Sequence, residues 1–222
     1  STEAATEDSS EEGSSEDTTD ATTEEPKDPE KITYDFSSMT DDEFKKTIDD
    51  LTSDQTYEAL DAVWRNYCIS DILEPGSTFK PFTIAGAIED GVVKDGDTFY
   101  CKGYEIVADG TDPIYCHNRT GDGTLTLKQA LEQSCNVALM QIAKSEGKET
   151  FSKYQDIFNF GSQTGIDLSG EGSGLVYSEE NLNPVELATS SFGQGINVTM
   201  IQMAAAFCSL INGGNYYTPH TV

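Results

Sequence analysis

A serine and a lysine three residues apart offer the clearest chemistry in the chain. Ser77 and Lys80 lie in the segment Gly76-Ser77-Thr78-Phe79-Lys80-Pro81. Because proline is tolerated only within the first helical turn, Pro81 predicts a helix that begins near Ser77, and Gly91 is a natural place for it to end. Side chains at i and i+3 lie on one face of a helix. Lys80 could therefore act as the base for a serine nucleophile at a helix N-terminus.

A second polar pair occurs in the segment Ser134-Cys135-Asn136. Helices are predicted on both sides of it, over residues 126–133 and 137–145, so Ser134 and Asn136 would lie at a junction between helices. Each pair also has a plain structural explanation, because Ser and Asn are common helix caps and a lysine one turn on can be a surface residue. Spacing alone assigns neither pair a function.

The elements that must position these residues follow from the periodicity of the sequence. Thr40 and Glu43 fit a capping box for a short helix that ends near Leu51. On the next helix Tyr57, Leu60, Val63, Trp64 and Tyr67 form an apolar stripe, which favours burial in the core. Short apolar pieces within residues 95–123 predict small strands. An apolar helix over residues 199–211 is expected to be buried all round, with Cys208 as a small core residue.

Composition limits the function further. The formal net charge is −27, and residues 1–30 contain twelve acidic side chains and one lysine. Nucleic acid is excluded as a partner, since phosphate binding requires clustered Lys and Arg. Residues 1–30 are nearly devoid of apolar side chains, which predicts a disordered acidic Ser/Thr/Glu linker or insertion ahead of a domain over residues 31–222.

The chain contains five cysteines. Cys101 and Cys116 bracket a segment rich in Gly and Asp, and a disulfide between them would close a loop of about 15 residues, worth about 3 kcal/mol in the chain-entropy model. Two ordinary thiols are the alternative. Zinc is disfavoured because Cys116-His117 lacks a second closely spaced ligand pair. The sequence therefore predicts a possible disulfide, with no metal and no cofactor.

Together these motifs resemble the transpeptidase domain of class B penicillin-binding proteins, over about residues 57–222. The matching segments are Trp64-Arg65-Asn66, Glu74 to Phe82, Ser134 to Asn136, Phe160-Gly161 with Thr164 to Leu168, and Ser191 to Thr199. The pair Cys101 and Cys116 is most similar to the sporulation-type branch, the stage V sporulation protein D-like proteins. The resemblance implies an α+β fold of the β-lactamase/transpeptidase type, present here mainly as its helical part with small strands.

The resemblance also implies a role for each polar residue. Ser77 would be the acylated nucleophile, with its backbone N–H as half of an oxyanion hole, and Lys80 would be its base. Ser134 would relay a proton to the leaving amine, and Asn136 would bind the substrate's peptide backbone. The implied reaction is peptidoglycan D,D-transpeptidation, in which Ser77 attacks the D-Ala-D-Ala bond of a stem peptide and a neighbouring stem amine resolves the acyl-enzyme into a crosslink. β-Lactam antibiotics would acylate the same serine.

The chain departs from the family pattern at its third motif, because no Lys-Thr-Gly or Lys-Ser-Gly tripeptide occurs in the sequence. In the family this motif follows a segment that matches residues 213–220. We therefore expect a fragment that lacks most of the central antiparallel sheet and is inactive alone. The resemblance further implies a membrane anchor outside the fragment, a location on the extracytoplasmic face of the cell membrane, and division or sporulation glycosyltransferases as partners.

Two other functions remain open. A serine β-lactamase also contains Ser-x-x-Lys and Ser-x-Asn, but it needs a group that speeds deacylation, and the only carboxylates in the long loop of residues 161–184 besides Asp167 are Glu171, Glu179 and Glu180. The pattern of that loop matches the penicillin-binding proteins instead. A non-catalytic cell-envelope scaffold is disfavoured because all four polar residues of the two motifs are intact.

Overall fold

The computed structural model describes residues 39–49 and 51–221, and the chain divides into two compact units, Ser1–Val63 and Trp64–Val222. The segment expected to be disordered, residues 1–30, lies outside the described residues. Helix α1 (Asp41–Asp49) belongs to the first unit, and α2 (Ser53–Trp64) ends at the boundary. The predicted capping box is present, because the Glu43 carboxylate accepts hydrogen bonds from the Thr40 amide and hydroxyl.

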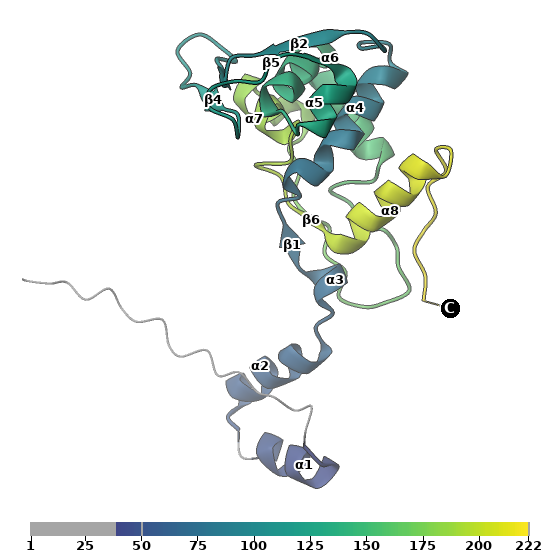
Figure 1. The fold of residues 1–222 in the computed structure, drawn as a ribbon. Coiled ribbons are helices and arrows are strands. Elements are labelled where there is room, and N and C mark those ends of the chain that lie inside the picture. The colour runs from purple at the N-terminus through teal and green to yellow at the C-terminus, as the bar shows by residue number, and fades with distance from the viewer. Residues whose placement is uncertain (1–38, 50, 222) are drawn as a thin grey trace, which may run out of the picture. The chain divides into compact units, whose positions relative to one another are not determined.

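The second unit contains the helices that carry the chemical motifs (Figure 1). They are α3 (Tyr67–Ser70), the 3-10 turn η1 (Gly76–Phe79), α4 (Lys80–Glu89), α5 (Leu127–Glu132), α6 (Asn136–Ile157), η2 (Glu179–Asn181), α7 (Pro184–Ser190) and α8 (Met200–Ile211). Helix α6 packs against both α4 and α7. The long helix α6 therefore connects the two predicted motifs, because Asn136 is its first residue and α4 continues from the Ser77 turn.

The strands of the described residues are short and pair only in twos. The antiparallel pairs are β1 (Ile72–Leu73) with β6 (Val198–Thr199), β2 (Thr98–Cys101) with β5 (Gly123–Thr126), and β3 (Tyr104–Glu105) with β4 (Ile114–Tyr115). The register of the second pair places Cys101 opposite Gly123. The small strands predicted within residues 95–123 are thus present, and the helix-rich α+β architecture is confirmed.

Two hydrophobic clusters hold the start of α4. Phe79 and Phe82 pack among aromatic rings, with the Phe79 and Phe160 centroids 5.0 Å apart. Further along α4, Ile84 and Ala87 belong to the other cluster, which also contains residues of α5, α6 and the strands β2 and β5. Because the helix contributes to both clusters, the turn that carries Ser77 is fixed by packing at two places.

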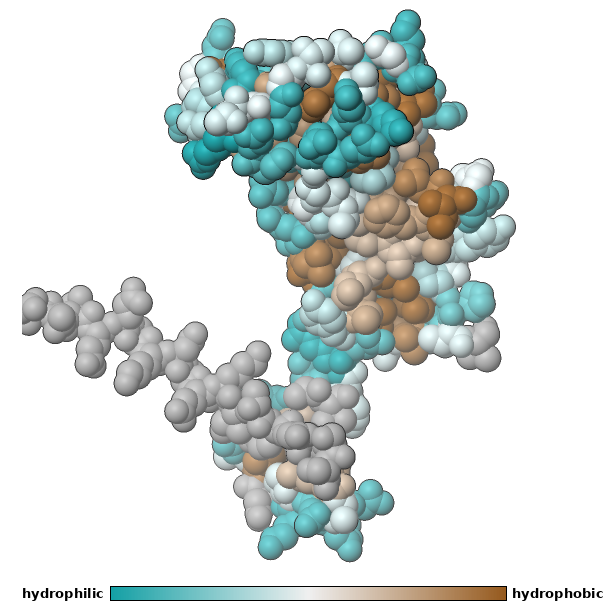
Figure 2. Space-filling model, viewed as in Figure 1, coloured by the Kyte–Doolittle hydropathy of each residue, from teal (hydrophilic) through white to brown (hydrophobic). Residues whose placement is uncertain are grey.

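Several predictions of burial are wrong. Tyr57, Trp64 and Tyr67 are exposed, and Trp64 retains 72% of its accessible surface. Helix α8 buries one face, whereas Ile211 and Cys208 are exposed, and hydrophobic colour covers the surface over α8 in Figure 2. Periodicity identifies an apolar face of a helix, but it does not determine whether another element covers that face.

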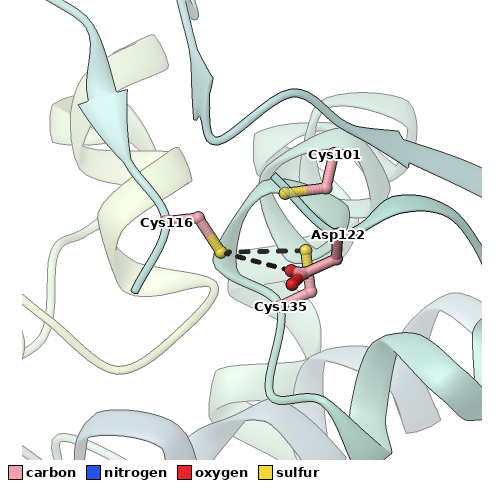
Figure 3. Close-up of side chains that lie close together, drawn as sticks. All are labelled: Cys101, Cys116, Asp122 and Cys135. Atoms are coloured by element: carbon pink, nitrogen blue, oxygen red, sulfur yellow. Dashed lines mark hydrogen bonds between the residues drawn. The ribbon is translucent and has the colours of Figure 1, made fainter. Parts of the chain in front are cut away.

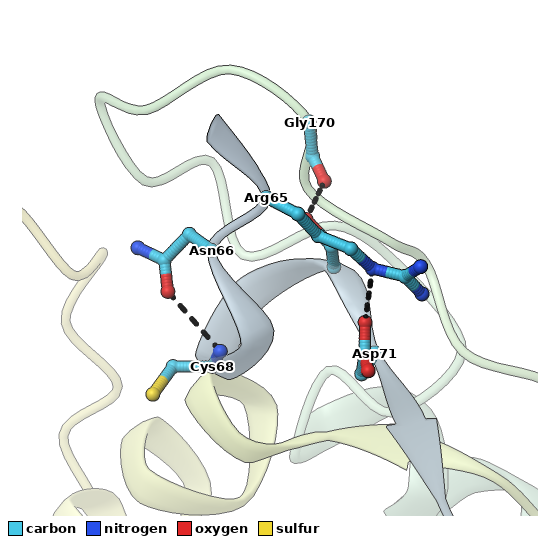
Figure 4. A network of polar contacts seen from close by, with 6 residues as sticks. Arg65, Asn66, Cys68, Asp71 and Gly170 are labelled. Carbon is cyan, nitrogen blue, oxygen red and sulfur yellow. Dashed lines mark hydrogen bonds and ion pairs between the residues drawn. The ribbon is translucent and has the colours of Figure 1, made fainter. Parts of the chain in front are cut away.

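The motif Trp64-Arg65-Asn66, which begins the second unit, has a clear structural role (Figure 4). Asn66 caps helix α3, accepting a hydrogen bond from the Cys68 amide at 3.1 Å, and Arg65 Nε donates to Asp71 Oδ1 at 2.6 Å. The Ser70 hydroxyl donates to the Gly170 carbonyl at 2.7 Å, which ties α3 to the long loop.

None of the described helices has the length and apolar character needed to cross a bilayer.

Candidate active site

The nucleophile candidate lies on a 3-10 turn rather than on the α-helix itself. The turn Gly76–Phe79 passes directly into α4, whose first residue is Lys80 and whose first turn contains Pro81. In a 3-10 helix residues i and i+3 are eclipsed, so the predicted proximity of Ser77 and Lys80 is retained. The Ser77 side chain is exposed, whereas Lys80 is fully buried, with 0% of its surface accessible. The serine therefore faces solvent while the lysine lies beneath it.

The Lys80 ammonium joins the two predicted motifs. Its Nζ donates to the Ser134 carbonyl at 2.5 Å, to Ser134 Oγ at 2.8 Å and to Asn136 Oδ1 at 2.7 Å. Ser134 Oγ in turn donates to Ser77 Oγ at 2.9 Å. The structure thus brings all four predicted residues together, with Ser134 Oγ between the nucleophile candidate and the lysine.

Ser134 has an unusual backbone conformation, with φ of +53°. It occupies the left-handed position after α5, where its amide bonds to the Leu131 carbonyl and the Cys135 amide bonds to the Ala130 carbonyl. This is the Schellman arrangement, in which glycine is the usual residue because a Cβ is unfavourable there. The strain is retained at a residue whose hydroxyl lies in the site, a pattern typical of functional positions.

The segment after Ser191 supports the turn from the other side. The Gly76 amide donates to the Gly193 carbonyl at 2.9 Å, and the Gly195 amide donates to the Glu74 carboxylate at 2.8 Å. A Cβ on Gly193 would lie 2.1 Å from the Gly76 carbonyl oxygen, so only glycine permits this approach. In the sequence, the Ser191–Thr199 segment is distinguished only by its resemblance to the family. Its Gly-Gln-Gly spacing was the signal for a close backbone contact.

The environment of Lys80 changes its proton affinity. Burial lowers the pKa of the amine to about 8, against the smaller opposing effect of the Cys116 and Cys135 sulfurs. A lysine with this pKa is partly neutral near neutral pH, and only the neutral amine can accept a proton. The site therefore combines a solvent-facing hydroxyl, a bridging hydroxyl and a buried amine that can act as a base.

Comparison with known proteins identifies the family of this chain. The model of the penicillin binding protein transpeptidase domain matches residues 23–222. The chain belongs to the penicillin-binding protein transpeptidase family. Over 157 residues it is 44% identical to stage V sporulation protein D of Bacillus subtilis, an alignment that covers 70% of this chain and 24% of that protein. The resemblance to the sporulation-type branch is thereby confirmed.

Two further relatives of the transpeptidase family extend the comparison. Peptidoglycan D,D-transpeptidase FtsI of Escherichia coli is 31% identical over 152 residues, which cover 68% of this chain and 25% of that protein. The crystal structure of Pseudomonas aeruginosa PBP2 superimposes with a TM-score of 0.69 at 26% identity, covering 77% of this chain and 41% of that one. The chain thus spans about a quarter of the length of these two curated relatives.

The predicted disulfide is absent, because Cys101 and Cys116 are both free thiols in the structure. A third sulfur lies close to both predicted partners: the sulfurs of Cys101, Cys116 and Cys135 lie within 4.8 Å of one another, and Cys116 Sγ lies 3.9 Å from Cys135 Sγ. In the sequence, Cys135 stands out only as the middle residue of Ser134-Cys135-Asn136. No spacing in the sequence relates Cys135 to Cys101 and Cys116, which lie 34 and 19 residues before it.

Glu171, one of the carboxylates considered for deacylation, has a structural role. Its side chain accepts hydrogen bonds from the Thr164 amide at 2.6 Å, the Thr164 hydroxyl at 2.5 Å and the Gly165 amide at 3.1 Å. These bonds close the loop of residues 164–171. The Glu171 carboxylate therefore stabilises the conformation of its own loop.

Proposed function

We propose that this chain contributes the acyl-transfer residues of a peptidoglycan D,D-transpeptidase, with Ser77 as the nucleophile. The observation that carries the proposal is the hydrogen-bonded path from Ser77 Oγ through Ser134 Oγ to Lys80 Nζ, with steps of 2.9 and 2.8 Å. The substrate class comes from the relatives, one of which is named a peptidoglycan D,D-transpeptidase. It would be a stem peptide ending in D-Ala-D-Ala.

The direction of proton transfer follows from the charge of Lys80. When Lys80 is an ammonium, it donates to Ser134, and Ser134 donates to Ser77. When Lys80 is neutral, the path reverses, so the Ser77 proton passes to Ser134 and the Ser134 proton passes to Lys80. Ser77 Oγ can then form a bond to the scissile carbonyl carbon, and the proton is held on Lys80 Nζ.

The remaining steps use the same path in the opposite direction. As the peptide bond breaks, the proton on Lys80 returns through Ser134 to the nitrogen of the departing D-alanine, leaving an ester on Ser77. The amine of a neighbouring stem peptide then attacks the ester carbonyl and forms the crosslinking amide bond, as the bond between that carbonyl carbon and Ser77 Oγ breaks. The proton lost by the amine passes to Ser77 Oγ and restores the hydroxyl. Asn136 Oδ1 accepts a hydrogen bond from Lys80 Nζ. The side-chain NH₂ group of Asn136 is then left to donate to a substrate carbonyl.

We place this activity on the extracytoplasmic face of the cell membrane, where peptidoglycan is assembled. Its ligands would be stem peptides and β-lactams, and its partner a peptidoglycan glycosyltransferase. The site does not support the β-lactamase alternative, which needs a carboxylate to speed deacylation. The Glu171 carboxylate instead accepts hydrogen bonds from the Thr164 and Gly165 amides. A penicillin is therefore expected to form a long-lived ester.

The test is labelling of the protein, as its gene encodes it, with a fluorescent penicillin. We expect one label, mapped to the Ser77 peptide by mass spectrometry and absent from Ser77→Ala. Ser145→Ala is the matched control, because Ser145 is an exposed serine of α6 whose hydroxyl donates to the Gln141 carbonyl of the same helix. Labelling that persists in Ser77→Ala would contradict the proposal. Steady hydrolysis of a chromogenic cephalosporin would instead indicate a β-lactamase.

A further inference from the structure

Four ligand-type side chains converge around Cys135, the middle residue of the Ser134-Cys135-Asn136 motif (Figure 3). They come from four segments: Cys101 ends β2, Cys116 follows β4, Asp122 precedes β5, and Cys135 is the N-cap of α6. One ligand atom from each lies within 4.8 Å of all the others. No pair of these residues is close enough in the sequence to form a familiar metal motif, so the fold alone assembles the group.

The cluster is shielded from solvent. Cys101, Cys116 and Cys135 retain 2%, 3% and 0% of their accessible surface. By contrast, Cys68 and Cys208 are exposed. Three buried sulfurs around one carboxylate form a donor set of the kind that soft and borderline metal ions prefer.

The separations agree with a shared metal ion better than with a disulfide. Cys116 Sγ lies 3.9 Å from Cys135 Sγ and 3.9 Å from Asp122 Oδ2. Ligands held tetrahedrally by zinc at about 2.3 Å are about 3.8 Å apart, whereas bonded sulfurs lie about 2.05 Å apart. A disulfide would also use two of the three sulfurs and leave the third unpaired beside the carboxylate.

Hydrogen-bond donors surround the candidate ligands. The Asn118 side chain donates to Asp122 Oδ1 at 2.7 Å, which leaves Oδ2 directed toward Cys116. The Ala138 amide donates to Cys135 Sγ at 3.5 Å. Donors of this kind orient metal ligands and stabilise their negative charge. His117 Nδ1 lies 3.5 Å from Cys116 Sγ at the exposed side.

We propose that Cys101, Cys116, Cys135 and Asp122 bind one Zn²⁺ as a closed, four-coordinate structural site. Three thiolates and one carboxylate fill a tetrahedral shell, so the ion has no open position for catalysis, and its binding releases the thiol protons. The ion would tie β2 and the segment between β4 and β5 to the start of α6. Because Cys135 lies between Ser134 and Asn136, the zinc site would hold both residues in place. The inference does not depend on the proposed reaction.

The first experiment measures metal in the protein as its gene encodes it, purified with reductant and without chelator. Mass spectrometry of the metals should give one zinc per chain, and thiol titration under denaturing conditions should find every cysteine reduced. Replacement by Co²⁺ should produce a thiolate-to-cobalt charge-transfer band and the visible bands of tetrahedral cobalt. These readouts require neither catalysis nor a mutation.

Variants then locate the ion. Cys116→Ser and Asp122→Asn should each weaken zinc binding at least about tenfold, whereas Cys68→Ser and Cys208→Ser should retain one zinc per chain. Asp122→Asn keeps the shape of the side chain and serves if Cys116→Ser fails to fold. The proposal is overturned if the reduced wild-type protein gives no cobalt–thiolate band, if zinc content is equal in all four variants, or if Cys116 and Cys135 are isolated as a disulfide.

Discussion

The two side-chain clusters that meet at Ser134-Cys135-Asn136 are assembled in different ways. The cluster of Ser77, Lys80, Ser134 and Asn136 comes from two short motifs, each placed at the start of a helix. The cysteine cluster takes one residue from each of four segments, three of them in or beside short strands. Neighbouring residues of one segment therefore serve both clusters: Ser134 and Asn136 face Lys80, and Cys135 faces the other cysteines.

The difference shows which sites a sequence reveals. Helix geometry places residues i and i+3 together wherever the helix lies, so the Ser77–Lys80 pair is readable from spacing. Loops and short strands impose no such relation between Cys101, Cys116 and Asp122. Their proximity depends on the pairing of β2 with β5, which places Cys101 opposite Gly123 and thus beside Asp122.

Removing the amine should have the largest effect on the first cluster. Lys80→Ala is expected to slow acylation by a penicillin about 10³-fold, because the Ser77 proton then has no acceptor. The measurement is the rate of covalent labelling in stopped-flow or gel assays, and Lys153→Ala, at an exposed lysine of α6 paired with Asp90, is the control. A loss below about tenfold would show that Lys80 is not the base.

A paired substitution at Ser134 separates its hydroxyl from its backbone conformation. Ser134→Ala and Ser134→Gly both remove the bridging hydroxyl and should each slow acylation about 100-fold. Because φ is +53° at this position, the Gly variant should be about 1 kcal/mol more stable to denaturant than the Ala variant. Equal acylation by wild type and both variants would remove Ser134 from the proton path.

The pH profile tests the charge of the buried amine. Burial lowers the pKa of Lys80 to about 8, so its neutral fraction grows with pH, and acylation should rise about tenfold per unit below that value and level off above it. The buried Glu146 carboxyl beside Gly86 of α4 also has its pKa raised to about 8, by burial and then by Asp90. Glu146→Gln should retain the profile if Lys80 is its cause. A flat rate from pH 6 to 9 would contradict this assignment.

Glu146 should make the folded protein less stable as pH rises, whereas the acylation rate should increase with pH. Its pKa is higher in the folded protein than the ordinary value of 4.5, so the folded state binds more protons between these two values. The free energy of unfolding should therefore fall as pH rises from about 4.5 through 8. Denaturant titrations of wild type and Glu146→Gln should show this slope only in the wild type.

Metal removal should have the smallest effect on acylation and a measurable effect on stability. If zinc fixes the start of α6, a chelator should lower the melting temperature by about 2–4 °C for each kcal/mol lost and slow acylation less than Ser134→Ala does. The measurements are the melting temperature and the rate of penicillin labelling, each taken after chelation and again after zinc is restored. They check that metal removal slows acylation less than Ser134→Ala does. If the melting temperature changes with neither chelator nor added zinc, the cysteine cluster does not have the structural role we assign to it.

The sequence by itself determined the parts of the molecule that depend on local geometry. It predicted the helix that starts near Ser77 and the helix boundary at Ser134-Cys135-Asn136, because caps, prolines and side-chain periodicity act over a few residues. Its motifs also indicated the family, which the match over residues 23–222 confirms.

Only the tertiary structure decided which residues are covered and which distant residues meet. It left Tyr57, Trp64 and Cys208 exposed although their apolar character favoured burial. It also replaced the predicted pair of Cys101 and Cys116 with a cluster that includes Cys135 and Asp122. Such contacts join residues far apart in the chain through strand pairing and helix packing, and no local spacing encodes them.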